Sequence, residues 1–279
     1  MIRMALDMVC RILEEDTKAI DRIWATVLTM GPHQTTYFVT ALTQGVGFFA
    51  NCMKKDSINI GVLLLCISGF TLFLLFGAID VAGDWRTANR ESSGLAPLAK
   101  TTPEAVVQVY AARAFGWRGK FAVHTWISTK LEGADDYTVY QVLGWHSFKG
   151  GTALQIQKDI PDRYWFDAKP KILADLRGKD AAKAIKLIKE AAREYPYRKT
   201  YTTWPGPNSN TFTAYITRRV PTLNVDLPPT AIGKDYLPNG YITGRPPSGT
   251  GYQISILGAL GIIVSGKEGL EFNILGLSF

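Results

Sequence analysis

The chain has 279 residues, of which 47% are hydrophobic and 20% are charged. This length and balance fit one or two domains with a buried core and exclude an intrinsically disordered chain. The cysteines Cys10, Cys52 and Cys66 all precede residue 84, so the rest of the chain can form neither a disulfide nor a thiolate nucleophile. With three histidines in the whole sequence, we expect no metal site, and nothing in the sequence calls for a cofactor.

Residues 1–55 predict a cytoplasmic or interfacial helical segment. Apolar side chains recur at helical spacing over residues 4–30, which favours an amphipathic helix. Its acidic cluster at residues 14–16 favours packing on a partner protein over an anionic lipid surface. Residues 31–53 are uncharged but rich in Thr and Gln, so we interpret them as an interfacial or re-entrant segment or, alternatively, as a second membrane span.

A transmembrane helix is predicted within residues 56–83. Residues 60–79 read IGVLLLCISGFTLFLLFGAI and contain no charged side chain, which is long enough to cross a bilayer at about 1.5 Å per residue. Lys54 and Lys55 precede this run and favour a cytoplasmic N-terminus. We therefore expect a single-pass protein of the bacterial inner membrane whose C-terminal domain is periplasmic.

The charge is divided unevenly between the two sides of this span. Residues 85–279 carry 25 basic and 16 acidic side chains, a net charge of +9. A basic domain held at a bilayer favours anionic lipid or cell-wall polymer as a partner, and the alternative is a merely soluble surface. Nucleic acid is not an expected partner, because the membrane tether and the expected compartment keep it away.

The remaining sequence predicts a linker over residues 84–103 and an extracytoplasmic α+β domain over residues 104–279. Its fold class is an antiparallel sheet with packed helices, preceded by the one transmembrane helix. The expected elements are a helix over 104–115, a β-hairpin of 121–130 and 137–146, strands near 153–158 and 171–176, a helix over 180–195 capped by Asp180, and a helix from Asn208 to Arg219. The helix over 180–195 is expected to bury one apolar face, made of Ala184, Ile185, Leu187, Ile188, Ala191 and Ala192. Residues 254–264 are apolar but interrupted by glycines, which indicates a core segment or a membrane-facing lip.

A candidate site combines the segment WPGPNSNTF, residues 204–212, with His124. Asn208 suits a helix cap, which places Ser209 in the first turn, where free backbone N–H groups around Ser209 and Asn210 could bind an oxyanion. His124 lies in a strand-like run and is the expected base. If Lys130 pairs with Tyr137, Gln141 lies diagonally beside His124 on the same face and could orient its ring.

Structural roles for the same residues stay open. A serine after an asparagine at a helix start is often part of a cap alone, and a histidine among apolar neighbours is often a core residue. Lys234, Asp235 and Tyr236 could form a ligand wall, or they could be an ordinary surface loop.

Two resemblances follow from these motifs. The segments HTWI (124–127) and NSNTF (208–212) resemble the permuted papain-like families, such as circularly permuted NlpC-type peptidases and the lecithin–retinol acyltransferase group, in which a strand histidine precedes a helix-start Asn-Cys-x-x-Phe. Asn208 and Phe212 match, whereas Ser209 stands in place of the cysteine. The resemblance implies an amidase or acyltransferase acting on an amide or ester of the cell envelope.

The second resemblance is broader. Seven segments that together cover nearly all of residues 85–279 are similar to an uncharacterised family of bacterial membrane-anchored proteins: WRTANR (85–90), AVVQVYAARAFGWRGKFAVHTWI (105–127), YPY (195–197), WPGPNSNTF (204–212), LPPTAIGKDYL (227–237), PSGTGYQ (247–253) and EGLEFNILGL (268–277). This family implies no settled activity. Two functions therefore remain: a Ser209–His124 hydrolase or acyltransferase, and a non-catalytic accessory subunit whose residues 1–80 dock on a larger membrane complex.

Overall fold

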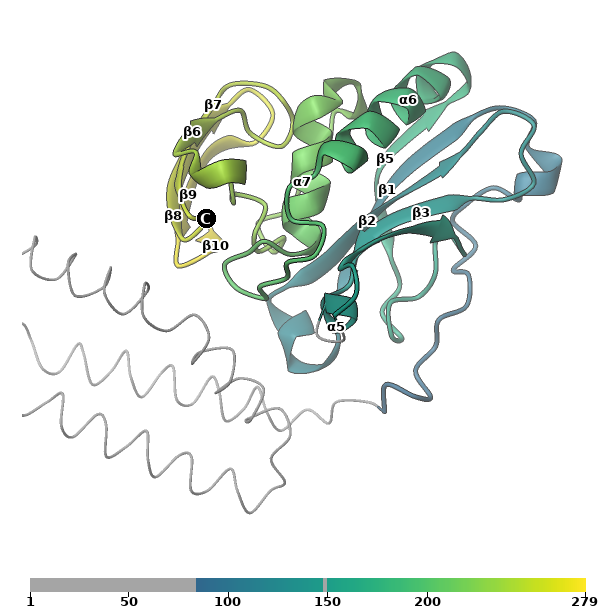
Figure 1. Ribbon diagram of the computed structural model, residues 1–279, viewed down its shortest axis with the longest axis horizontal. Helices are drawn as coiled ribbons and strands as arrows, with labels where there is room; N and C mark the ends of the chain where they lie inside the picture. Colours follow the sequence, from purple (N-terminus) through teal and green to yellow (C-terminus); the bar gives the residue numbers. More distant parts are fainter. Residues whose placement is uncertain (1–83, 148–149) are drawn as a thin grey trace, which may run out of the picture. The chain divides into compact units, whose positions relative to one another are not determined.

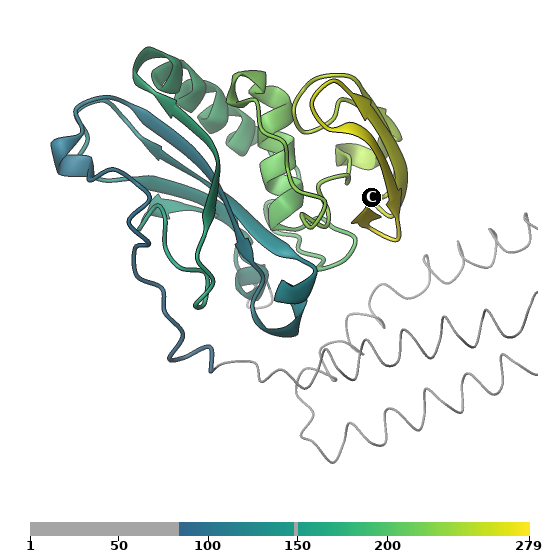
Figure 2. The ribbon, with the colours of Figure 1, turned by 180° about the vertical axis from the view of Figure 1, so that it is seen from behind.

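Two antiparallel β-sheets with helices between them form the folded part of this chain (Figures 1 and 2). The structure is a computed structural model that describes residues 84–147 and 150–279. The predicted cytoplasmic segment and the predicted membrane span lie outside these ranges. Within the ranges, no helix is both long and apolar enough to cross a membrane. The α+β class expected from the sequence is confirmed.

The first sheet has five strands in the order β4-β3-β2-β1-β5. The strands are β1 (Val106–Arg113), β2 (Val123–Lys130), β3 (Thr138–Val142), β4 (Leu154–Lys158) and β5 (Lys171–Arg177). The predicted hairpin is confirmed as β2 and β3, and the two further predicted strands are β4 and β5. Ile127 pairs with Tyr140 and Thr129 with Thr138, which is the register that follows from placing Lys130 opposite Tyr137.

The helix predicted over residues 104–115 is wrong, because Val106–Arg113 is strand β1. This strand lies between β2 and β5, and every residue except Arg113 is buried. A strand covered on both faces reads as a continuous apolar run without alternation, and three β-branched valines favour extended backbone over helix.

Two helices cover one face of the first sheet. They are α6 (Gly178–Glu194) and α7 (Ser209–Arg219), and α7 packs on β2 and β3 while α6 packs on β1 and β5. Asp180 lies in the first turn of α6 and does not cap it; the N-cap position is Arg177, which makes no side-chain capping bond. Leu187, expected on the apolar face, is 43% exposed. The buried face is Ala181, Ala184, Ile185, Ile188, Ala191 and Ala192.

Two segments, residues 89–97 and residues 159–168, cover the opposite face of the sheet, and we call them together the strap. Residues 89–97 lie within the segment predicted as a linker, and they run alongside residues 159–168 and are hydrogen-bonded to them. Asp162 is fully buried and accepts hydrogen bonds from the hydroxyls of Ser92 and Ser93 and from the backbone N–H groups of Leu95 and Ala96. The side chains beneath the strap form a second core: Tyr110, Ala112, Trp126, Val139, Leu143 and Trp165.

The chain beyond α7 forms a second sheet that the sequence did not predict. Its order is β10-β9-β8-β7-β6, a meander in which each strand pairs with its neighbour in sequence. The strands are β6 (Thr243–Gly244), β7 (Tyr252–Ile256), β8 (Leu260–Ser265), β9 (Gly269–Ile274) and β10 (Leu277–Ser278). In both ribbon views α7 lies between the two sheets (Figures 1 and 2).

Short helical pieces complete the described fold. They are α5 (Gly144–Ser147) and four 3-10 turns: Ala99–Thr101, Gly116–Lys120, Pro221–Leu223 and Pro238–Gly240. Gly258, between β7 and β8, requires a glycine: its φ is +70°, and a Cβ there would lie 3.1 Å from the Tyr236 backbone.

The neighbouring residues Ile188 and Leu187 test the observed face of α6. We expect Ile188→Ala to lower the free energy of unfolding by about 2–5 kcal/mol, because it opens a cavity in a fully buried site. Leu187→Ala should change it by less than about 0.5 kcal/mol, because the side chain is largely in water. Chemical denaturation of the full chain in mild detergent, followed by circular dichroism, measures both; equal losses would contradict this orientation of the helix.

Candidate functional site

The segment Trp204–Phe212 forms the entry to α7, as the sequence predicted. Asn208 is the N-cap, and its Oδ1 accepts hydrogen bonds from the backbone N–H of Asn210 at 2.9 Å and of Thr211 at 3.2 Å. The Thr211 hydroxyl in turn accepts from the Asn208 backbone N–H at 3.1 Å, which completes a capping box. Ser209 is the first helical residue and is 5% exposed.

The same side chains also bind the loop that follows α7. The Asn208 amide donates to the carbonyl of Ile232 at 3.0 Å, and the Asn210 amide donates to the same carbonyl at 2.8 Å. The Thr211 hydroxyl donates to the carbonyl of Gly233 at 2.8 Å. Gly233 has a φ of +95°, and a Cβ there would lie 2.5 Å from Nδ2 of Asn208, so only glycine fits. We call this arrangement the asparagine clamp: Asn208, Asn210 and Thr211 holding Ile232 and Gly233.

The asparagine clamp extends to strand β2 through Thr125. The Thr125 hydroxyl lies 3.0 Å from Oδ1 of Asn210 and 2.9 Å from the Thr213 hydroxyl. The Asn210 amide also donates to the carbonyl of Val123 at 3.0 Å. Thr125 therefore faces α7, and the start of the helix is tied to the start of β2.

His124 points to the other face of the sheet. Its ring stacks on Trp165 with centroids 3.7 Å apart and planes 8° apart, and it also lies against Trp126. Both tryptophans belong to the core under the strap. Because successive strand residues alternate between faces, the contact of Thr125 with α7 requires His124 to lie on the opposite side.

The structure therefore does not bring the predicted base and nucleophile together. Ser209 is the first residue of α7, which lies on the helix-covered face of the sheet, and His124 lies under the strap on the other face. The Asn210 backbone N–H, expected as an oxyanion donor, is already bonded to the Asn208 side chain. Gln141 does lie beside His124, as the predicted register required, and the two side chains share a hydrogen bond.

Burial controls the protonation of His124. Desolvation lowers the pKa of its imidazole to about 3, and the hydrogen bond with Gln141 opposes this only in part. Among the described residues its Nε2 has no hydrogen-bond partner. The ring is therefore neutral at physiological pH and acts as a flat packing surface for Trp165.

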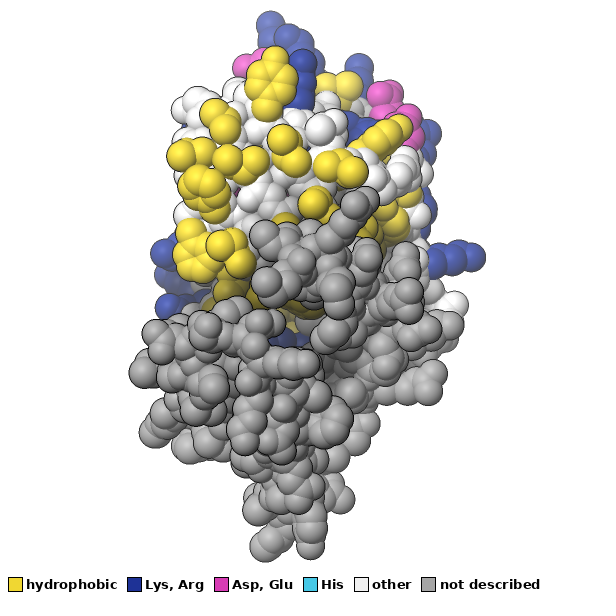
Figure 3. Space-filling view, turned by 90° about the vertical axis from the view of Figure 1, so that its left-hand side faces the viewer, with side chains coloured by type: hydrophobic (Ala, Val, Ile, Leu, Met, Phe, Trp, Pro, Cys, Tyr) yellow, Lys and Arg dark blue, Asp and Glu magenta, His cyan; other side chains and the backbone are white. Residues whose placement is uncertain are grey.

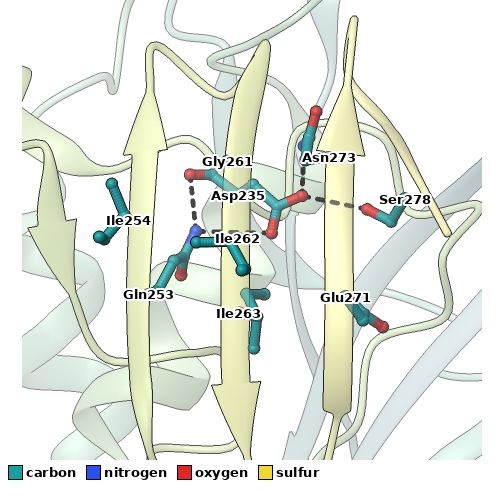
Figure 4. Close-up of a pocket in the computed structure, with 9 residues that line it drawn as sticks. All are labelled: Asp235, Gln253, Ile254, Gly261, Ile262, Ile263, Glu271, Asn273 and Ser278. Carbon is teal, nitrogen blue, oxygen red and sulfur yellow. Dashed lines mark hydrogen bonds between the residues drawn. The ribbon is translucent and has the colours of Figure 1, made fainter.

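A second polar cluster lies beneath the second sheet and centres on Asp235 (Figure 4). Its carboxylate accepts hydrogen bonds from the Asn273 amide and from the Ser278 hydroxyl, the latter at 3.1 Å. The Gln253 amide donates to the Asp235 backbone carbonyl at 3.0 Å. These donors come from β7, β9 and β10, so one aspartate, through its carboxylate and its backbone carbonyl, joins three strands to the loop after α7.

Lys234 and Arg218 add two cations to this cluster, the first buried and the second half-buried. Lys234 is 1% exposed; its ammonium pairs with Glu271 and lies 3.7 Å from Oδ1 of Asp235. Arg218, on α7, donates to the Lys234 carbonyl at 2.7 Å and to the Gln253 side chain at 2.9 Å. Burial lowers the pKa of the Arg218 guanidinium to about 10 and raises that of the Glu271 carboxyl.

The Lys234–Asp235 pair is thus neither a surface loop nor an open ligand wall. Sequence reasoning missed this cluster, although one signal was present: the polar residues of β7 and β9 alternate strictly with apolar ones. Within residues 84–147 and 150–279, no group of three or more His, Cys, Asp or Glu side chains is placed to hold a metal ion.

Comparison with known proteins finds a family model that matches part of the chain. Residues 104–236 match the family model described as "Protein of unknown function (DUF3750)", which spans β1 to the asparagine clamp and Asp235. This agrees with the expected resemblance to an uncharacterised family. No curated protein matches the chain. No solved structure matches it either.

The adjacent residues Asn208 and Ser209 give one test of the asparagine clamp. We expect Asn208→Ala to lower the free energy of unfolding by about 2–3 kcal/mol, because it removes the helix cap and the amide donor to the carbonyls of Thr203 and Ile232, the second of which is buried. Ser209→Ala should change it by no more than about 0.5 kcal/mol. Both values come from chemical denaturation of the full chain; a Ser209→Ala cost as large as that of Asn208→Ala would show that the hydroxyl is a structural group.

The buried imidazole gives a pH dependence. Since the folded pKa of His124 is about 3 and the unfolded value is 6.5, the unfolded chain binds more protons between these values, so stability falls as the pH falls below 6.5. This contribution approaches about 1.4 kcal/mol per pH unit. Denaturation curves recorded at several pH values between 7 and 4 give the free energy of unfolding at each pH. This free energy should fall less steeply with falling pH in His124→Gln than in the wild type, and an identical pH dependence in both would mean that the ring is solvated.

Proposed function

We propose that the chain is a membrane-anchored accessory protein whose folded domain is non-catalytic and is built on a permuted papain-like scaffold. Residues 60–79 supply the membrane anchor, and residues 1–80 bind a larger membrane complex. The folded domain stabilises that assembly on the extracytoplasmic side of the bacterial inner membrane.

The asparagine clamp is the observation that carries this proposal. Every polar side chain of the motif except Ser209 is bound to α7, β2 or the loop at Ile232. These bonds hold secondary-structure elements together inside the domain. The segment WPGPNSNTF, which resembles a catalytic motif, therefore supplies structural contacts at the start of α7.

The placement of His124 gives independent support. A serine hydroxyl is weakly acidic and needs a base within hydrogen-bond reach, directly or through one water. The imidazole of His124 is instead stacked on Trp165 on the other face of the sheet. With the nucleophile and the base in different layers, acyl transfer by this pair has no route.

The papain-like part of the proposal rests on connectivity. A five-stranded antiparallel sheet carries the HTWI segment on an inner strand, β2, and a later helix begins at Asn-Ser-x-x-Phe against that strand. This is the order of elements that the permuted families use, with Ser209 in the position of their cysteine.

A serine-reactive fluorophosphonate tests the absence of catalysis. We expect no covalent adduct on the full-length protein in detergent, and the same result for Ser209→Ala and His124→Ala. Intact-protein mass spectrometry detects such an adduct directly. Labelling of the wild type that disappears in both variants would overturn the proposal.

Native purification in mild detergent tests the accessory role. We expect the full chain to be isolated with stoichiometric membrane-protein partners, and Ser209→Ala to retain them unchanged. Removal of residues 1–55 should release the partners. A chain that purifies alone at every detergent concentration would contradict this role.

A further inference from the structure

The second sheet is apolar on the side that faces solvent. On β7, β8 and β9, every outward position holds an apolar side chain, and eight of the nine are exposed. We call these nine positions the outer face: Tyr252, Ile254, Ile256, Leu260, Ile262, Val264, Leu270, Phe272 and Ile274. Figure 3 shows hydrophobic side chains spread over this side of the molecule, with lysine and arginine side chains at its margins.

The inner side of the same strands is mostly polar, and Ile263 is the buried apolar residue on it. Its buried positions include Gln253, Ser255, Glu271 and Asn273, three of which bond to Asp235 or Lys234 (Figure 4). This is the reverse of the usual pattern, in which a one-sided sheet buries its apolar face. The inner bonds fix the register, because a slip of one residue would exchange the two faces.

An exposed apolar surface of this extent indicates a contact partner. Single exposed apolar residues are ordinary in soluble proteins, but contiguous patches mark binding or membrane surfaces. Tyr252 is 82% exposed, Leu270 59% and Phe279 70%, so the part of the chain that the structure describes leaves most of each side chain uncovered. Burying them would be favourable, because it would remove apolar surface from water.

The chemistry of the chain favours a lipid bilayer as that partner. The same chain carries residues 60–79, twenty residues without a charge, which are expected to anchor it in a membrane. Residues 85–279 carry a net charge of +9, which attracts the domain to anionic headgroups. Tyr252, Phe272, Phe279 and Tyr241 add exposed aromatic rings, which are enriched where protein meets the headgroup layer.

The sheet is suited to lie on the bilayer and not to cross it. Its strands have at most six residues, whereas a membrane-crossing strand needs about nine to eleven. Its edge strands β6 and β10 have two residues each, and open edges do not occur in the hydrocarbon region. Only the outward side chains can enter the lipid.

We propose that the outer face of the second sheet inserts its side chains into the interface of an anionic bilayer and holds the domain flat on the membrane. This inference rests on the proposed membrane attachment and adds the lipid-contacting surface. The inner cluster around Asp235 then has a role, because it lets the inner side of the sheet be polar while the outer side is apolar.

Site-specific fluorescence quenching tests the proposal in the full chain. The background carries Cys10→Ser, Cys52→Ser and Cys66→Ser, and single cysteines labelled with a polarity-sensitive dye replace Ile254, Phe272 or the control residue Leu187, which is exposed on α6. The protein is reconstituted into vesicles of phosphatidylethanolamine and phosphatidylglycerol. We expect lipid-borne nitroxides to quench positions 254 and 272 severalfold more than position 187, and aqueous iodide to do the reverse.

Four outcomes would overturn the inference. Equal lipid quenching at 187 and 272 would show no oriented insertion. Shielding of 254 and 272 from both quenchers would show that protein, either residues 1–83 or a second copy, covers the face; a cross-link between two chains through position 272 identifies the second copy. Labels at 254 and 272 that remain in water while the protein still floats with the vesicles would reject the lipid contact alone. Protein that fails to float with the vesicles would reject the membrane attachment itself.

Discussion

Successive residues of a β-strand point to opposite faces, and in β2 this rule decides what the HTWI segment does. Thr125 bonds to Asn210 and Thr213 on α7, so the helix is fixed on that side of the strand. His124 must then point toward the strap, where its ring stacks on Trp165 and lies beside Gln141. Turning His124 toward Ser209 would break the contacts of Thr125, so the strand cannot serve both arrangements.

Buried polar groups play a similar part in both halves of the described domain. The asparagine clamp and the cluster around Asp235 bury amides, two carboxylates and the ammonium of Lys234, and these groups are hydrogen-bonded or ion-paired to one another or to the backbone. A buried polar group without a partner is costly, so such networks tolerate few alternative packings. Arg218 on α7 connects the helix to the second cluster and joins both sheets to one helix.

The sequence predicted the parts of this fold that depend on local signals. The register of β2 and β3 followed from turn residues and alternation, and the cap of α7 followed from Asn208. It could not predict β1, because a strand buried on both faces has no alternation to distinguish it from a helix. Whether Ser209 and His124 lie close together depends on which face of the sheet α7 covers, and the spacing of residues in the sequence does not determine that face. The sequence did not predict the second sheet, because the apolar side of that sheet faces solvent and glycines interrupt its hairpins.

The strap has a consequence for how the domain encounters lipid. The Asn89 backbone N–H donates to the Asp167 carboxylate at 2.7 Å, so the fold is held from residue 89 onward. Nine residues separate this point from the end of the uncharged run at Ile79, and an extended chain of that length reaches only about 35 Å. In the proposed arrangement, lipid contact is an intramolecular event at an effective concentration on the order of millimolar. A surface too weak to hold a free domain on a membrane is then strong enough to set its orientation there.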